Sequence, residues 1–307
     1  MPNWGEVTRE IEQKSHPMDD IRTKYLRILS KYTGRNVIAY YSGFMQFPTA
    51  RQISIEDEDK NAFMQMVYGM DRSKGLDLIL HTPGGDIAAT ESLVYYLRQM
   101  FGTNIRAFIP QMAMSAGTMI ALSCKEIIMG KQSNLGPIDP QYGGISCAGV
   151  LKEFSMALKD VRENPSSAAV WASIIGKYHP TFLGDCENAI RWSKTIVTGW
   201  LASNMLLRVK NKEEKAQKIV DALSDHDGTF AHNRHIHMDE LKRLGVKVIP
   251  LESFEKQRIE SCKDLQDCLL TLHHAYIQTI GTCGILKILE NQNGNSMRIS
   301  IPIMERK

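Results

Sequence analysis

Two short apolar runs each end in a tight turn that opens a helix-like pattern. The first run, residues 76–80, is followed at 81–86 by His-Thr-Pro-Gly-Gly-Asp, and the second, residues 105–109, leads at 111–118 into Gln-Met-Ala-Met-Ser-Ala-Gly-Thr. Strand, turn and helix used twice in succession predict right-handed parallel β-α-β units. The first N–H groups of a helix have no intrahelical acceptor and stabilise negative charge. The two turns are therefore the places where we expect an anion to be bound or generated.

The neighbouring residues continue this alternation. Residues 37–41 and 126–129 read as strands, and Asp86 is a suitable N-cap for an amphipathic helix that Gly102 can end. Residues 116–122 form a short helix pattern with a serine at its start. This alternation of strands and helices predicts an α/β fold with a parallel sheet.

Three segments are expected along the chain. Residues 1–34 should form a helical leader, residues 35–204 the α/β core, and residues 205–307 an extension of helices and a strand packed on that core. Within the extension, a helix is predicted over residues 253–276.

Composition and charge exclude several classes of protein. A net charge of +3 over 307 residues gives no basis for binding nucleic acid or an anionic membrane. The amino terminus is polar, so we expect neither a signal peptide nor a membrane span, and cytoplasmic localisation is the prediction. The six cysteines are scattered without a Cys-x-x-Cys pair, which is typical of free thiols in a reducing compartment.

Ser115 is the candidate nucleophile. A serine at the start of a helix is often only an N-cap. Acyl transfer, however, needs hydrogen-bond donors that face the nucleophile from a second loop, and the Gly84-Gly85 turn can supply them. The same Gly-Gly turn is no phosphate loop, since it lacks Gly-x-Gly-x-x-Gly and Gly-Lys-Ser/Thr. A nucleophilic Ser115 is therefore the hypothesis that the two turns favour together.

Four sequence blocks carry a family resemblance. They are Thr-Pro-Gly-Gly at 82–85, Ala-Met-Ser-Ala-Gly at 113–117, Ser-Asn-Leu-Gly-Pro-Ile-Asp-Pro-Gln at 133–141, and a late block between residues 223 and 246. Together they resemble the Clp-fold serine peptidases, and within them the serine dehydrogenase proteinase family, a relative of signal peptide peptidase A and of the Clp proteolytic subunit. The resemblance spans roughly residues 32–251.

This resemblance implies a Clp/crotonase-like fold of parallel β-α-β units layered with helices. It places the oxyanion donors at the N–H groups of Gly85 and Ala116. It further implies a peptide or protein substrate, no cofactor and a homo-oligomer that encloses its sites. Because the chain has no nucleotide-binding motif, any dependence on ATP would require a separate unfoldase.

The base that would activate Ser115 stays open at this stage. In Clp proteolytic subunits a histidine follows the serine, but the matching block here offers Asp139, and no histidine lies between Ser115 and His179. Signal peptide peptidases use a lysine that burial keeps deprotonated, and Lys152 lies about where that arrangement requires it. Asp139 is then a base, an orienting group or a turn residue. Lys159, two turns further along the same helix, is less favoured, and Lys125 directly follows the serine helix.

The histidines give weaker candidates. His81, at a strand end, and His179 are either structural or catalytic. The cluster of His226, His232, His235 and His237 has no cysteine or carboxylate at zinc-finger spacing, so no metal site is predicted. We expect His232 and Arg234 to form a polar patch at a subunit contact.

The sequence thus predicts a serine endopeptidase that hydrolyses peptide bonds through an acyl-enzyme at Ser115, with Lys152 and Asp139 as further catalytic residues. Two alternatives remain. One is a non-catalytic scaffold or adaptor that has lost its base, and the other is a crotonase-type enzyme in which paired N–H groups polarise an acyl-CoA thioester.

Overall fold

The computed structural model describes residues 17–225, 231–254, 258 and 260–301. The first sixteen residues of the expected leader, and His226, lie outside this part of the chain.

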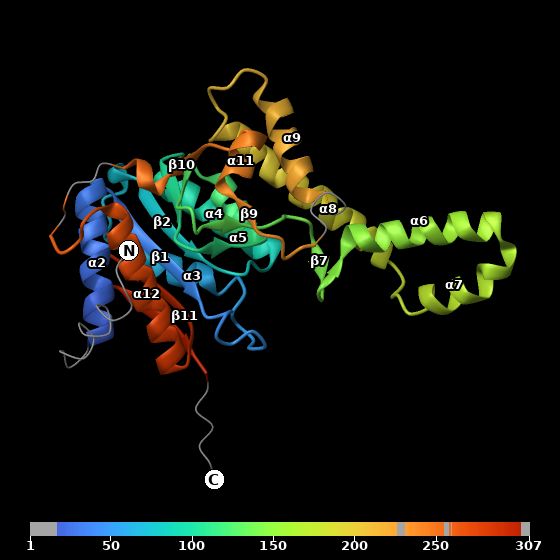
Figure 1. Cartoon of the computed structure of the whole chain (residues 1–307), viewed down its shortest axis with the longest axis horizontal. Helices are drawn as coiled ribbons and strands as arrows, with labels where there is room; N and C mark the ends of the chain where they lie inside the picture. The colour runs from blue at the N-terminus through green and yellow to red at the C-terminus, as the bar shows by residue number, and fades with distance from the viewer. Residues whose placement is uncertain (1–16, 226–230, 255–257, 259, 302–307) are drawn as a thin grey trace, which may run out of the picture.

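A mixed sheet forms the centre of the molecule (Figure 1). Among the described residues it contains seven strands in the order β10-β5-β3-β2-β1-β11-β12. They are β1 (Asn36–Ser42), β2 (Leu76–His81), β3 (Ile105–Ile109), β5 (Glu126–Met129), β10 (Val248–Pro250), β11 (Ile285–Asn291) and β12 (Ser296–Ser300). The first five are parallel to one another, and β11 and β12 join antiparallel at the edge next to β1. The predicted strands are confirmed, and the carboxyl-terminal residues complete the same sheet.

The central strands are apolar on both faces because helices cover both. In β1, Ile38 and Tyr40 pack towards one core, and Ala39 and Tyr41 towards the other. The helices α2 (Pro17–Thr33) and α12 (Leu265–Cys283) contribute to the second core. The first core is built with α3 (Asp59–Val67), α4 (Ile87–Phe101), α5 (Ala116–Ser123), α8 (Phe182–Ser203) and α9 (Lys212–Ser224). The layered α/β architecture follows from this double coverage.

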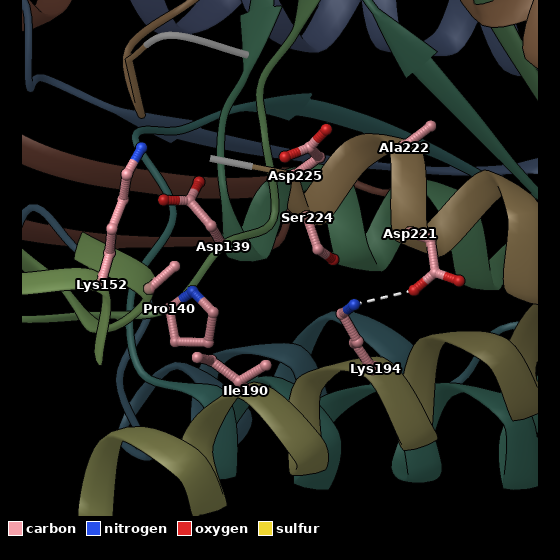
Figure 2. A pocket seen from close by; sticks show the side chains of 10 residues that line it. Asp139, Pro140, Lys152, Ile190, Lys194, Asp221, Ala222, Ser224 and Asp225 are labelled. Carbon is pink, nitrogen blue, oxygen red and sulfur yellow. Dashed lines mark hydrogen bonds and ion pairs between the residues drawn. The ribbon is translucent and has the colours of Figure 1, made fainter. Parts of the chain in front are cut away.

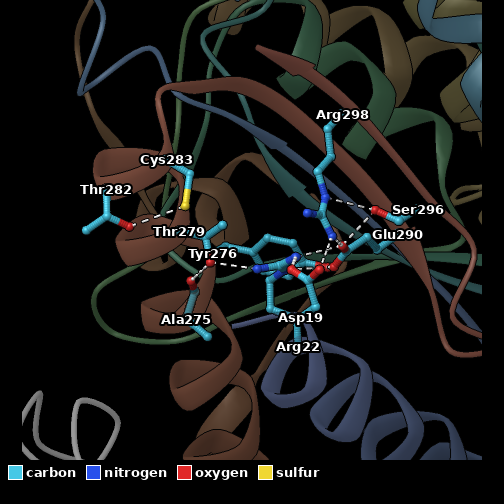
Figure 3. A network of polar contacts seen from close by, with 10 residues as sticks. All are labelled: Asp19, Arg22, Ala275, Tyr276, Thr279, Thr282, Cys283, Glu290, Ser296 and Arg298. Carbon is cyan, nitrogen blue, oxygen red and sulfur yellow. Dashed lines mark hydrogen bonds and ion pairs between the residues drawn. The ribbon is translucent and has the colours of Figure 1, made fainter. Parts of the chain in front are cut away.

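A buried polar network fastens α2 to the carboxyl-terminal elements (Figure 3). The guanidinium of Arg22, which is inaccessible to solvent, donates to both carboxylate oxygens of Glu290 on β11, at 2.8 and 2.9 Å, and to Thr279 on α12 at 2.6 Å. Tyr276 donates its hydroxyl to the same carboxylate at 2.9 Å. Residues more than 250 positions apart are thereby joined in one core.

The expected helix over residues 253–276 is displaced in the structure. The described residues from Phe254 to Asp264 are not helical, and the helix, α12, runs from Leu265 to Cys283. The physical reason is a cap: the carboxylate of Asp264 accepts from the N–H of Asp267 at 2.8 Å and fixes the start of the helix there.

A second, smaller sheet lies near the turns of interest. Its strands are β4 (Met112–Ala113), β6 (Asn134–Leu135) and β9 (Ile236–His237), in that order. β4 and β6 are parallel, and β9 is antiparallel to β6. This sheet fixes three segments that are far apart in sequence. The remaining short elements are η1 (Arg72–Lys74), β7 (Gln141–Tyr142), β8 (Ile145–Ser146), α11 (Met238–Leu244) and η3 (Leu251–Ser253).

An arm projects from the body of the molecule (Figure 1). It consists of α6 (Cys147–Glu163), η2 (Pro165–Ser167) and α7 (Ala168–Ile175). The sequence of α7 is Ala-Ala-Val-Trp-Ala-Ser-Ile-Ile, yet none of its residues is buried. An apolar helix without burial is unusual for an isolated globular chain.

Candidate active site

Ser115 occupies a strained turn between β4 and α5. Its backbone angles are φ 50° and ψ −116°, a region that residues with a side chain seldom adopt. Although Ser115 stands at the N-cap position of α5, its side chain makes no capping hydrogen bond. The capping explanation of this serine therefore fails, and its partly exposed hydroxyl remains available for another use. A serine on a sharp strand-to-helix turn is the arrangement of a nucleophile elbow.

The glycines around this turn are required by close packing. A β-carbon added to Gly84, which has φ +101°, would stand 2.7 Å from the β-carbon of Ser115. One added to Gly117 would stand 2.5 Å from the methyl group of Thr82. The Gly-Gly loop and the serine turn are also joined through backbone hydrogen bonds between Thr82 and both Met112 and Met114. The two predicted turns do lie together.

The same packing leaves two N–H groups suitable for an oxyanion. Ile55 forms a parallel bridge with Gly85, and its hydrogen bonds use the carbonyl of Gly84 and the N–H of Asp86. The N–H of Gly85 is not part of that bridge. Ala116 is the first residue of α5, where N–H groups have no intrahelical acceptor. Donors from two separate loops next to one serine are what stabilisation of an oxyanion needs.

Asp139 is buried and bonded to a histidine that the sequence analysis assigned elsewhere. Its side chain is 1% exposed, and its Oδ1 lies 2.7 Å from Nδ1 of His232, whose side chain is 23% exposed. Arg234 pairs with Glu240 at 2.9 Å, and the expected polar patch of His232 and Arg234 at a subunit contact stays a prediction. The 93 positions between Asp139 and His232 explain why no local pattern indicated the pair.

Lys152 and Asp139 line one pocket of about 640 Å³ (Figure 2). Lys194, Asp221 and Asp225 also line it, and Lys194 pairs with Asp221 at 2.7 Å. Lys152 is exposed to solvent. The desolvation on which a lysine base depends is thus not supplied by the described residues of a single chain.

His81 lies on the far face of the sheet from the serine helix. Along β2, Leu80 belongs to the core that includes Ala116, and the next residue, His81, therefore points to the opposite side. There its ring contacts Tyr41 and His273, at centroid distances of 5.4 and 5.2 Å. Burial lowers the pKa of His81 from 6.5 to about 3. The geometry gives His81 a structural role.

The other candidates are spread out. His179 is exposed between α7 and α8. Lys125 is exposed after α5, and Lys159 is exposed on the arm, where it pairs with Glu163. Within the described ranges, no group of three or more histidine, cysteine, aspartate or glutamate side chains is arranged to hold a metal ion.

Comparison with known proteins decides the family. Residues 10–256 match the model of the ClpP-like SDH-type serine proteinases. The chain belongs to this family. The Clp-like fold predicted from the four sequence blocks is thereby confirmed, and the serine turn and Gly-Gly loop of this ClpP-like proteinase lie inside the matched range.

Two relatives come from Methanocaldococcus jannaschii. The uncharacterized protein MJ0137 is 30% identical over 232 residues, which cover 74% of this chain and 73% of the relative. The uncharacterized protein MJ1495 is 28% identical over 242 residues, covering 76% and 74% respectively. Among solved structures, a mutant of the 1510-N membrane-bound stomatin-specific protease is similar with a TM-score of 0.40 and 15% identity, over 67% of this chain and 83% of that one. The family assignment does not depend on this last likeness.

For the described part of this ClpP-like proteinase, no helix combines the length and apolar character needed to span a membrane. All six cysteines are free thiols, and only Cys283 among them is exposed.

Proposed function

We propose that the protein is a serine endopeptidase that hydrolyses peptide bonds through an acyl-enzyme on Ser115. The observation that carries the proposal is the strained turn at Ser115, whose hydroxyl does not cap its helix and which packs against the Gly-Gly loop. Strain of about 1–3 kcal/mol at a single residue persists only where the surrounding structure imposes it, and such residues concentrate at functional sites.

The reaction would begin with attack of Ser115 Oγ on the scissile carbonyl carbon. The oxygen–carbon bond forms, the carbonyl electrons move to oxygen, and the resulting oxyanion would be bound by the N–H groups of Gly85 and Ala116. Each such donor lowers the barrier by about 3 kcal/mol. The C–N bond then breaks, the amine leaves with a proton, and water hydrolyses the acyl-enzyme. No step requires a cofactor.

A base must take the proton of Ser115, and the sequence-based candidate is Lys152. Lys152 lines the same pocket as Asp139, and Ser115 is not among the residues that line it. Because Lys152 is exposed in one chain, a Ser115–Lys152 dyad would need a second copy to bury the lysine.

Assembly into a homo-oligomer is part of the proposal. The exposed apolar helix α7, in which Val170 is 63% exposed, supports it, since association would remove this surface from water. The substrate would be a peptide or protein, and any dependence on ATP would require a separate unfoldase.

The test is covalent labelling of the intact, full-length protein with a fluorophosphonate, followed by mass spectrometry. We expect one adduct on the wild type and none on Ser115→Ala. Ser155→Ala serves as control, because Ser155 is exposed on the arm and bonds only within its own helix. A folded wild type that stays unlabelled, as monomer and as oligomer, would contradict the proposal and favour a non-catalytic scaffold. Tight binding of coenzyme A in its place would favour an acyl-CoA enzyme.

A further inference from the structure

The hydrogen bond between His232 and Asp139 has the chemistry of a histidine held for proton transfer. An ionised carboxylate only accepts hydrogen bonds, so its contact with Nδ1 at 2.7 Å requires that Nδ1 carry the hydrogen. In neutral imidazole the other nitrogen, Nε2, is then the unprotonated one and can accept a proton. The buried position of Asp139, 1% exposed, keeps this tautomer and the ring orientation fixed.

The small sheet brings this pair to the serine turn. Ser115 follows β4 by two residues, Asp139 follows β6 by four, and His232 precedes β9 by four. Because β4 and β6 are parallel and β9 is antiparallel to β6, all three side chains emerge at the same end of the sheet. Adjacent strands are about 4.8 Å apart, so the segment after β6 neighbours both of the others, and those of β4 and β9 begin about 10 Å apart across it.

Packing after β6 supports the same placement. A β-carbon added to Gly136 would stand 3.4 Å from the α-carbon of Met114, the residue before Ser115. The N–H of Gly136 also donates to Thr118 on the serine helix at 2.9 Å. Asp139 is the third residue after Gly136, a span of at most about 11 Å for extended chain. The buried carboxylate therefore belongs to the surroundings of Ser115.

We propose that His232, oriented by Asp139, is the general base for Ser115. The inference rests on the proposed peptidase function and assigns the proton transfer of that reaction. The chain order Ser115, Asp139, His232 explains why the sequence, which has no histidine between Ser115 and His179, seemed to lack a base.

Ser115, His232 and Asp139 together account for every proton transfer in the reaction. As Oγ of Ser115 bonds to the carbonyl carbon, its proton passes to Nε2 of His232, and Asp139 stabilises the imidazolium without being protonated. The imidazolium returns that proton to the amine nitrogen as the C–N bond breaks. In the second half, water loses a proton to His232 while attacking the acyl-enzyme, and the proton returns to Ser115 as the acid leaves.

His232 meets the requirement for a base better than Lys152 does. Lys152 is exposed, and a lysine becomes an acceptor at neutral pH only when burial or neighbouring charge removes its proton. The imidazole of His232 is 23% exposed and its Nδ1 is held by a carboxylate, so its other ring nitrogen can accept a proton without prior desolvation.

The experiment measures the rate of fluorophosphonate labelling of the full-length protein by mass spectrometry. We expect His232→Ala to slow labelling by about 10²–10⁴-fold, the usual contribution of general base catalysis. His235→Ala is the matched control and should label at the wild-type rate, because His235 is exposed in the same loop. Asp139→Asn should also be slow, since an amide no longer holds the required tautomer.

Chemical rescue separates a base from a structural residue. Added imidazole should restore labelling of His232→Ala in proportion to the concentration of neutral imidazole, and should leave Ser115→Ala unlabelled. Wild-type labelling that persists unchanged in His232→Ala, or that is lost only in Lys152→Ala, would overturn the assignment while leaving the peptidase proposal intact. Absence of labelling in the wild type would overturn both. A slow His232→Ala with native thermal melting and no rescue would also count against the base.

Discussion

Gly84 and Ser115 lie so close together that a β-carbon on the glycine would stand 2.7 Å from that of the serine. The Gly-Gly loop, with its proposed oxyanion donor, and the turn of the proposed nucleophile therefore pack at one fixed distance. Any side chain at position 84 must push one of them away.

Gly84→Ala should consequently reduce peptide hydrolysis and fluorophosphonate labelling by about 10²–10³-fold, the cost of a misplaced oxyanion donor. Gly102→Ala is the control, since Gly102 also has a positive φ, of 60°, but no atom lies within 4 Å of the added carbon. Comparing labelling rates of the two variants separates backbone strain, which both suffer, from displacement of Ser115. Equal labelling rates in Gly84→Ala and Gly102→Ala would show that the contact between position 84 and Ser115 does not affect the reaction.

The buried, neutral His81 should make stability depend on pH. Above about pH 6.5 the ring is neutral in both the folded and the unfolded chain. Below that, the unfolded chain binds a proton that His81, with its pKa of about 3, does not bind in the folded state. The free energy of unfolding therefore falls by about 1.4 kcal/mol per pH unit between 6.5 and 3, or about 2 kcal/mol at pH 5.

Urea unfolding at pH 7.5 and pH 5.0 measures this loss. In His81→Phe the decrease between the two pH values should be smaller by about 2 kcal/mol, whereas in His179→Phe, an exposed histidine, it should match the wild type. Part of the pH dependence of the free energy of unfolding should persist in His81→Phe, because burial also lowers the pKa of His273 well below its usual value. An identical decrease in His81→Phe and wild type would refute the role of His81.

Arg22 should be one of the most sensitive positions for folding. Among the described residues, Arg22→Met leaves the carboxylate of Glu290, 5% exposed, with only the longer ion pair to Arg298 at 3.4 Å, and breaking a buried pair from one side costs about 3–5 kcal/mol. Arg27→Met, on the exposed face of the same helix, should cost less than about 1 kcal/mol. Denaturant midpoints of the two variants test the difference. A small effect at Arg22 would mean that α2 contributes little to the core.

The apolar helix α7 of the arm should control assembly. A charge in place of Val170, which is 63% exposed on α7, would make burial of that surface between copies costly. We therefore expect Val170→Asp to sediment as a smaller species than the wild type in analytical ultracentrifugation. Leu207→Asp, at a position 51% exposed outside the arm, should assemble normally. A wild type that is monomeric at all concentrations would exclude this function of the arm.

Sequence alone determined the features that depend on local chemistry. The apolar runs, the Asp86 cap and the glycine and serine turns are each set within a few residues, and they were sufficient to predict the parallel sheet, the family and the place of Ser115. Helix ends such as Asp264 were less well predicted, because which of several polar residues becomes a cap depends on what the helix packs against.

Only the tertiary structure decided which distant residue pairs with Asp139. The bond between Asp139 and His232 spans 93 positions and exists because β6 pairs with β9, a contact without any local signature. Likewise, the side of the sheet that His81 faces follows from strand parity combined with the helices that cover each face. A local sequence pattern reflects the conformational preference of each turn. Long-range strand pairing determines which distant residues lie next to that turn.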